Sequence, residues 1–134
     1  MIGLKRVYDP PSLADGKRFL VDRLWPRGLS AAALRIDGWL KDVAPSDALR
    51  RWFGHDPRRW DEFVRRYHAE LDARPEAWAP LASAAREGPI TLLFSARDTE
   101  HNNAVALRAY LLGRLTAGPR RRGRRGASAG RSDR

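Results

Sequence analysis

A small α/β protein, with helices packed on one sheet, is the fold class that the sequence predicts, and three observations support it. Residues 90–94 form a short uninterrupted apolar run, which is typical of a strand covered on both faces. One amphipathic helix is expected before this run and another after it, and strand and helix signals alternate along the preceding chain. The 134 residues provide for one domain, which we expect to span residues 1–118.

The first third of the chain contains the other strand signals. Strands are expected over residues 4–8, 18–24 and 36–40. Asp15-Gly16 provides a turn between the first two, and Trp25-Pro26-Arg27-Gly28 ends the second. Ser30 is expected to cap a helical turn over residues 31–34.

Further helices are expected in the rest of the chain. They cover residues 47–53, the segment from Asp56-Pro57 to Leu71, residues 78–87, and the segment from Asp98 or Thr99 to Gly118. Ser46 is suited to cap the first of these helices, and Gly54 is suited to end it in a left-handed conformation. The second helix is the clearest, because apolar side chains recur on one face at Trp60, Phe63, Val64, Tyr67 and Leu71. Pro75 and Pro80 are expected to interrupt the chain before the third.

The composition excludes several classes of protein. The chain has no Cys, which excludes a disulfide scaffold, a thiolate metal site and a cysteine nucleophile. The three His residues, at positions 55, 68 and 101, lack the spacing of metal ligands, so we expect neither a metal nor a cofactor. No apolar run approaches the roughly 20 residues that a membrane helix needs. We therefore expect a cytoplasmic protein that does not associate with membranes.

The positive charge is concentrated at the end of the chain. The formal net charge is +10, and residues 119–134 contain seven Arg and one Asp with no large apolar side chain. Such a segment cannot bury enough apolar surface to offset its ordering entropy, so we expect a disordered basic tail. It would bind nucleic acid weakly and without sequence preference by neutralising phosphates. The alternative is a solvated tail in a chain that is rich in Arg throughout.

Polar side chains cluster after the predicted second strand. Arg23 and Arg27 flank a rigid Trp-Pro turn, where two guanidinium groups can hold a phosphate or a carboxylate. Asp22 is a candidate for accepting a proton or for orienting one of these arginines. The alternative is an internal salt bridge between Asp22 and an Arg that closes the loop.

Two more polar clusters follow further along the chain. Lys41 precedes a helix, and His55 lies in a turn between two helices, where it either reaches a cleft or points to solvent. Arg97, His101 and Asn102 lie between the apolar strand and the last helix, where free backbone N–H groups favour an anion. The alternative there is ordinary capping by Asp98 or Thr99. In parallel sheets, ligands bind beyond the carboxyl ends of the strands, and these clusters fall there.

Within residues 7–115 the chain contains, in this order, the blocks D-R-L-W-P-R-G, W-L-K-D-V-A-P-S, W-F-G-H-D-P, F-V-R-R-Y and S-A-R-D-T-E-H-N-N-A. Together they resemble the YeaO-like branch of the bacterial domain of unknown function 488. The resemblance implies a compact cytoplasmic α/β domain. Relatives in the broader family have a cysteine at the end of the strand matching Phe94 and a Cys-His-Arg triplet matching Asn102-Asn103-Ala104. This chain lacks both, so its site would work through Arg, Asp, His and amide groups.

These observations lead to a functional hypothesis with two alternatives. We expect a cleft that binds a phosphate or nucleotide-like small molecule through Arg23, Arg27, Lys41, Arg97, His101 and Asn102. If the protein is an enzyme, Asp22 or His55 is the candidate acid or base. The first alternative is a nucleic-acid-binding or regulatory protein that acts through its basic tail. The second is a protein-interaction module, which exposed Trp side chains would indicate.

Overall fold

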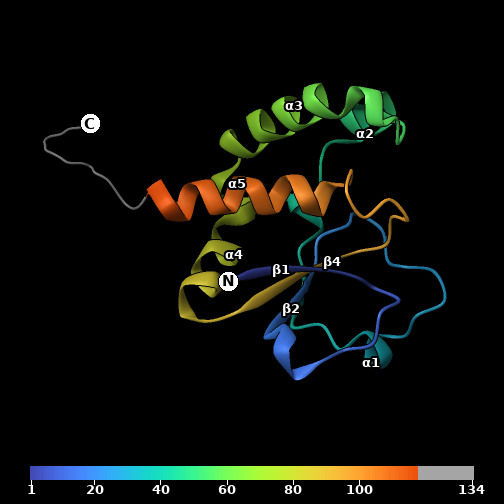
Figure 1. Ribbon diagram of the computed structural model, residues 1–134, viewed down its shortest axis with the longest axis vertical. Helices are drawn as coiled ribbons and strands as arrows, with labels where there is room; N and C mark the ends of the chain where they lie inside the picture. Colours follow the sequence, from blue (N-terminus) through green and yellow to red (C-terminus); the bar gives the residue numbers. More distant parts are fainter. Residues whose placement is uncertain (118–134) are drawn as a thin grey trace, which may run out of the picture.

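The computed structural model describes residues 1–117 as a four-stranded parallel sheet covered by helices, which confirms the predicted fold class (Figure 1). The strands are β1 (Ile2–Arg6), β2 (Lys17–Leu20), β3 (Gly38–Trp39) and β4 (Ile90–Phe94). The helices are α1 (Ala31–Leu34), α2 (Asp47–Phe53), α3 (Trp60–Asp72), α4 (Pro75–Glu87) and α5 (Asn103–Ala117). The tail expected over residues 119–134 lies outside the described residues.

Strand β4 is central, as its continuous apolar sequence predicts. The strand order is β1-β4-β2-β3, and β4 pairs in parallel with β1 on one side and β2 on the other. All five of its residues are buried, because helices cover one face of the sheet and a long loop covers the other. The carboxyl ends of β1, β2 and β4 therefore point to one edge of the sheet.

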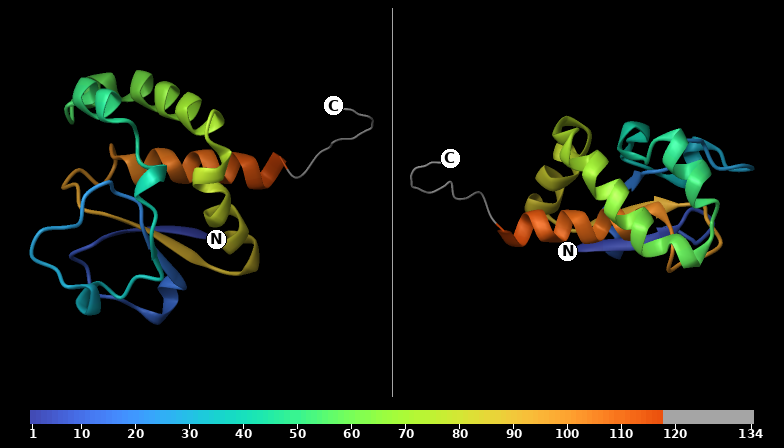
Figure 2. Two further views of the ribbon diagram at one scale, coloured as in Figure 1. Left: turned by 180° about the vertical axis from the view of Figure 1, so that it is seen from behind. Right: turned by 90° about the horizontal axis from the view of Figure 1, so that it is seen from above.

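The two faces of the sheet are covered differently. On one face α5 packs directly on β1 and β4, and α3 packs on α5 from outside (Figures 1 and 2). The core of this layer joins Ile90 and Leu92 of β4 to Phe63 and Tyr67 of α3. On the opposite face, Leu93 packs in a smaller cluster with side chains of the loop that contains α1. This loop also follows the carboxyl end of β2, so its packing determines what lies at that edge.

Both early strands have different bounds from those predicted. Strand β1 covers residues 2–6 instead of 4–8, and β2 ends at Leu20 instead of residue 24. The chain leaves the sheet just after Val21, whose N–H still donates to the carbonyl oxygen of Leu93 at 3.2 Å. The Asp22 side chain, which follows, accepts hydrogen bonds from Ser95 and so directs this departure.

Local sequence patterns predicted some helix ends correctly and others incorrectly. Ser30 and Ser46 cap α1 and α2 as predicted, and Gly54 ends α2 with φ 54°. Helix α4 begins at Pro75 instead of residue 78, because proline at the first helical position loses no hydrogen bond. Helix α4 continues through Pro80, which is exposed, so the expectation that Pro80 interrupts the chain was wrong.

The amphipathic stripe of α3 faces the core, and this generates a stability prediction. Phe63 is 2% exposed and stacks on Phe53 with ring centroids 4.3 Å apart. Replacing Phe63 with Ala should lower the free energy of unfolding by about 3 kcal/mol or more, because it leaves a cavity between α2 and α3. Urea denaturation measures this loss. A loss below about 1 kcal/mol would contradict the packing of the stripe.

A buried ion cluster at the amino end of the sheet generates a second prediction, for pH dependence. The Asp15 carboxylate lies 2.5 Å from Arg18 Nη1 and 2.9 Å from Lys5 Nζ. Burial raises the pKa of Asp15, but hydrogen bonds from Lys5, the Ser12 N–H and Arg18 outweigh it and hold the pKa below its usual 3.8. A lowered native pKa stabilises the fold above the unfolded pKa, and this stability is lost as the pH falls below about 4.

Asp15→Asn should therefore be less stable than the parent at pH 7, because Arg18 stays buried without its partner charge. The difference should shrink as the pH falls below about 4, where the parent loses the same charge. Urea denaturation from pH 7 to pH 2.5 measures both proteins. A difference that stays constant over this range would show that the Asp15 charge does not stabilise the fold.

Candidate functional site

A cleft of about 620 Å³ opens at the carboxyl edge of the sheet, where the loops after β2 and β4 meet α2 and the start of α5. In Figure 1 these segments lie at the end of the sheet away from the N-terminus. The cleft is lined by Tyr8, Asp22, Arg23, Leu24, Trp25, Pro26, Arg27, Ala44, Pro45, Arg50, Arg51, Phe53, His55, Phe63, Ser95, Ala96, Asn102 and Asn103. Of the predicted site residues, the lining includes Asp22, Arg23, Arg27, His55 and Asn102.

Asp22 links the carboxyl ends of β2 and β4. Its Oδ2 accepts hydrogen bonds from the backbone N–H of Ser95 at 2.9 Å and from Ser95 Oγ at 2.8 Å. Next to it, Asn103 Nδ2 donates to the carbonyl oxygen of Val21 at 3.1 Å, which attaches α5 to β2. These contacts fix the Asp22 carboxylate in place through its Oδ2.

The loop after β2 is fixed by its own polar contacts. Trp25 Nε1 donates to the carbonyl oxygen of Leu29 at 2.7 Å, and Tyr8 donates its hydroxyl proton to the carbonyl oxygen of Arg27 at 3.0 Å. Gly28 has φ 82°, a backbone conformation that favours glycine. The loop therefore presents Arg23 and Arg27 to the cleft from a defined backbone.

The opposite wall is helix α2, which is positioned by the longer helix α3. Glu70 of α3 accepts hydrogen bonds from the backbone N–H of Ser46 at 2.8 Å and from Ser46 Oγ at 2.6 Å. The same Ser46 Oγ caps α2 by accepting from the N–H of Leu49. This places Arg50 and Arg51 of α2 along the cleft.

Four guanidinium groups thus line the cleft, and one carboxylate outside its lining is shared by two of them. Asp47 Oδ1 lies 2.6 Å from Arg50 Nη2 and 3.7 Å from Arg23 Nε. The Arg50 hydrogen bond, with further attraction from Arg23 and Arg51, holds the pKa of Asp47 below its usual 3.8. The distance between Asp47 Oδ1 and Arg23 Nε is too long for a hydrogen bond. The buried Nε of Arg23 therefore has no acceptor within residues 1–117.

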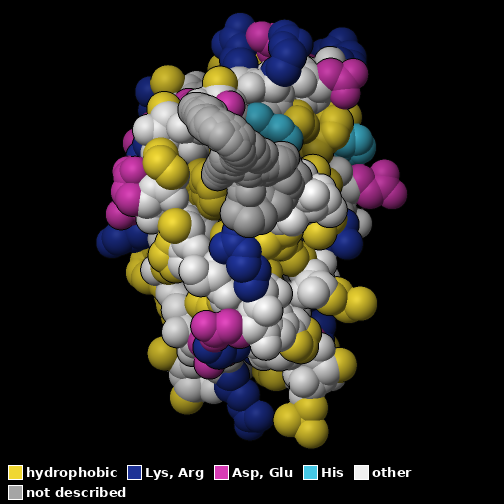
Figure 3. All heavy atoms as spheres, turned by 90° about the vertical axis from the view of Figure 1, so that its left-hand side faces the viewer, with side chains coloured by type: hydrophobic (Ala, Val, Ile, Leu, Met, Phe, Trp, Pro, Cys, Tyr) yellow, Lys and Arg dark blue, Asp and Glu magenta, His cyan; other side chains and the backbone are white. Residues whose placement is uncertain are grey.

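Within the same described residues, Arg27 and Arg51 form no side-chain hydrogen bond or ion pair. The cleft therefore contains more positive charge than the neighbouring carboxylates neutralise. Figure 3 shows the opposite end of the molecule, where Lys and Arg side chains lie beside Asp and Glu side chains at several places.

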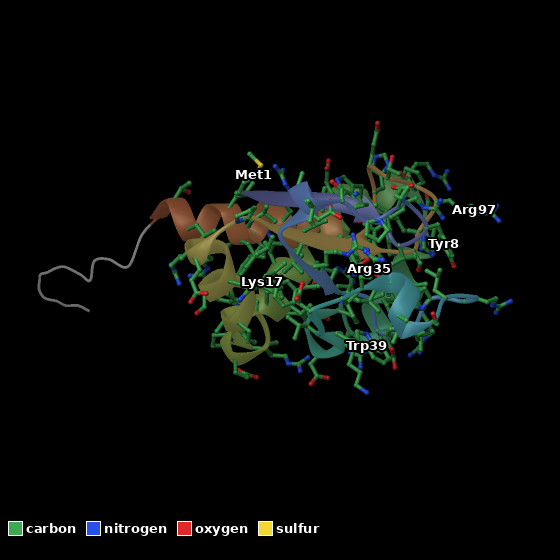
Figure 4. All side chains as sticks on the ribbon, turned by 90° about the horizontal axis from the view of Figure 1, so that it is seen from below. Met1, Tyr8, Lys17, Arg35, Trp39 and Arg97 are labelled. Atoms are coloured by element: carbon green, nitrogen blue, oxygen red, sulfur yellow. The ribbon has the colours of Figure 1, made fainter. Side chains whose placement is uncertain are left out.

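Three of the predicted binding residues lie outside the lining of this cleft. Lys41 lines a second hollow of about 240 Å³ and lies over the Trp39 ring at 5.1 Å. Arg97 is exposed, and its side chain points outward at the edge of the molecule (Figure 4). His101 contacts Asp98 Oδ2 at 3.0 Å and the edge of Trp60, with ring centroids 5.3 Å apart.

The loop after β4 is arranged differently from the predicted cap. Asp98 caps only a turn, by accepting from the N–H groups of Glu100 and His101. Asn102 caps α5, because its Oδ1 accepts from the N–H of Val105 at 3.0 Å while its Nδ2 donates to the carbonyl oxygen of Asp98. The expectation that Asp98 or Thr99 begins the last helix was therefore wrong. Asn102 is 3% exposed, and both polar atoms of its side chain have partners within the protein.

Sequence reasoning did not single out Arg50 and Arg51. Both belong to the short helix that Ser46 and Gly54 predicted, directly before the His55 turn. Two adjacent arginines before the His55 turn could have indicated an anion site. The sequence of a seven-residue helix, however, does not show which of its faces packs against the loop after β2. Asn103 was also missed as a site residue, because its hydrogen bond to Val21 depends on how α5 packs on the sheet.

Two classes of site are absent from the part of the chain that is described. No three His, Asp or Glu side chains within residues 1–117 gather closely enough to hold a metal ion. No helix among these residues is long and apolar enough to cross a membrane.

Together, these features define a small parallel α/β protein with a basic cleft at the carboxyl edge of its sheet. The chain belongs to the DUF488 family, and its residues 1–129 match the group described as "Inactive DUF488-N3 subclade". It is 43% identical to the uncharacterized protein YeaO of Escherichia coli (strain K12) over 110 residues, which are 82% of this chain and 96% of that protein.

Two mycobacterial proteins are also similar. The chain is 39% identical over 113 residues to uncharacterized proteins Mb3100c of Mycobacterium bovis and Rv3073c of Mycobacterium tuberculosis, which covers 84% of this chain and 95% of each of them. No solved structure matches the chain. The predicted resemblance to the YeaO-like branch is confirmed by these relatives.

The contact between Asp22 and Ser95 generates a third prediction. Asp22→Ala should lower the free energy of unfolding by about 1–3 kcal/mol, because it leaves the Ser95 N–H and hydroxyl without their acceptor. Asp22→Asn keeps an acceptor oxygen and should retain most of the stability. Thermal and urea denaturation of both variants measure this. Equal stability of Asp22→Ala and the parent would show that Asp22 is free for another role.

Proposed function

We propose that this protein binds a phosphate-bearing ligand in the cleft between the β2 loop and α2. The single observation that carries the proposal is the convergence of Arg23, Arg27, Arg50 and Arg51 on one cleft with too few carboxylates to neutralise them. Guanidinium groups recognise phosphate through paired, charge-assisted hydrogen bonds. An anion would also relieve the mutual repulsion of these arginines.

The position of the cleft supports this proposal independently of the arginine side chains. In parallel α/β sheets, ligands bind beyond the carboxyl ends of the strands, and the cleft adjoins the ends of β2 and β4. The start of α5, a helix of 15 residues, also lies at the cleft through Asn102 and Asn103. The partial positive charge of a helix amino end favours an anion.

Binding without catalysis is the form of this function that we favour. Asp22, one of the two acid or base candidates, accepts both of the hydrogen bonds that Ser95 donates. His55 remains an exposed residue of the lining, with φ 57° and no side-chain hydrogen bond within residues 1–117. The matching family group is described as inactive, which is consistent with a ligand-binding role.

A fourth prediction tests the proposal with adenosine 5′-monophosphate (AMP) as the probe. Calorimetric titration of the full chain at constant ionic strength should give saturable binding. Arg51→Ala should weaken this binding roughly tenfold or more, because it removes a charged donor from the cleft. Its melting temperature should stay unchanged, since Arg51 is exposed and forms no ion pair within residues 1–117.

Arg97→Ala is the matched control, because it removes the same charge from an exposed residue outside the lining. It should change the affinity less than about twofold. If Arg97→Ala abolishes binding and Arg51→Ala does not, the ligand lies at the β4 loop and the proposed position of the site is wrong. If the parent protein shows no saturable binding, the proposed function is wrong.

A further inference from the structure

Two large apolar side chains are exposed at the cleft that contains the arginines. Leu24 is 69% exposed and Tyr8 is 47% exposed, and both line this cleft. Within residues 1–117 the other exposed large apolar side chains are Met1, Leu13 and Trp39. An exposed apolar side chain alone needs no explanation, but two at one cleft indicate a surface that a ligand covers.

The interior of the cleft is also largely apolar. Its floor consists of buried side chains that also line the cleft, namely those of Ala44, Pro45, Phe53 and Phe63. Phe53 and Phe63 are stacked on each other and belong to the main core, which keeps this floor from rearranging. The volume of about 620 Å³ lies within the range of pockets that enclose small organic molecules. A bare phosphate ion would leave both the floor and the exposed apolar side chains uncovered.

The Tyr8 side chain is held in place before any ligand binds. Its hydroxyl donates to the carbonyl oxygen of Arg27 at 3.0 Å, and the Arg6 guanidinium lies 5.1 Å from its ring centroid. An aromatic ring that is already fixed loses little conformational entropy when a ligand packs on it. Arg27, whose carbonyl oxygen fixes Tyr8, itself lines the cleft, so the apolar contact and the charged contact are adjacent.

We infer that the ligand is an organic phosphate with a flat apolar body of nucleoside size, which packs against Leu24 and Tyr8 while its phosphate meets the arginines. This inference rests on the proposed function, because the arginines provide the phosphate contact. It adds that the apolar body contributes much of the affinity. The cleft therefore distinguishes a nucleoside monophosphate from inorganic phosphate and from a sugar phosphate.

The experiment compares three probes on the full chain: inorganic phosphate, ribose 5-phosphate and AMP. Each carries one phosphate, and only AMP adds a flat aromatic body. Isothermal titration at constant ionic strength should give affinities that rise in this order, with at least a tenfold step between ribose 5-phosphate and AMP.

Leu24→Ser tests the apolar contact, and Leu13→Ser is its matched control, because Leu13 is fully exposed and lies outside the cleft lining. Leu24→Ser should weaken AMP about five- to tenfold and leave inorganic phosphate unchanged, since it removes only apolar contact area. Leu13→Ser should change neither affinity. Melting temperatures of both variants should equal that of the parent, because neither side chain is buried.

The outcomes separate this inference from the proposed function. Equal affinity of the parent for AMP and inorganic phosphate overturns the inference and leaves the anion cleft standing. An equal loss of phosphate and AMP binding in Leu24→Ser also overturns it, because Leu24 would then act through the arginine loop. Absence of saturable binding for all three probes overturns the proposed function itself.

Discussion

The contact between the Asp22 carboxylate and Ser95 is the constraint on which the candidate site depends. It joins the carboxyl ends of two parallel strands, and it turns the chain out of the sheet immediately after β2. Because the chain leaves there, Arg23 and Arg27 lie beside the cleft instead of continuing along a strand. The same turn exposes Leu24 at the cleft and places the Trp25 ring against Trp39.

A second tertiary contact completes the cleft from the helical side. Glu70 binds Ser46 and so holds the start of α2 against α3, while α3 itself packs on α5. Arg50 and Arg51 thereby face the β2 loop across the cleft. Asp47 offsets only part of the electrostatic repulsion among the four guanidinium groups. A bound anion would offset the rest.

The sequence predicted those features that depend on local patterning. The apolar run of β4, the capping serines at 30 and 46, and the left-handed Gly54 all follow from neighbouring residues. The end of β2 and the cap of α5 were not predictable in this way, because each depends on a partner chosen by the fold. Asp22 meets Ser95, 73 residues later, and Asn102 displaces Asp98 and Thr99 as the cap. Likewise, Arg51 joins the cleft only through the packing of α2.

The most direct measurement is an ¹H–¹⁵N NMR titration of the full chain with AMP that includes the arginine Nε–H signals. The account predicts saturable shifts of Arg23 and Arg51 and of the backbone amides of residues 22–27, with Arg97 nearly unaffected. Shifts confined to residues 119–134 would contradict it, because the ligand would then bind the basic tail and not the cleft. The same conclusion would follow if no signal from the cleft moved at saturating AMP.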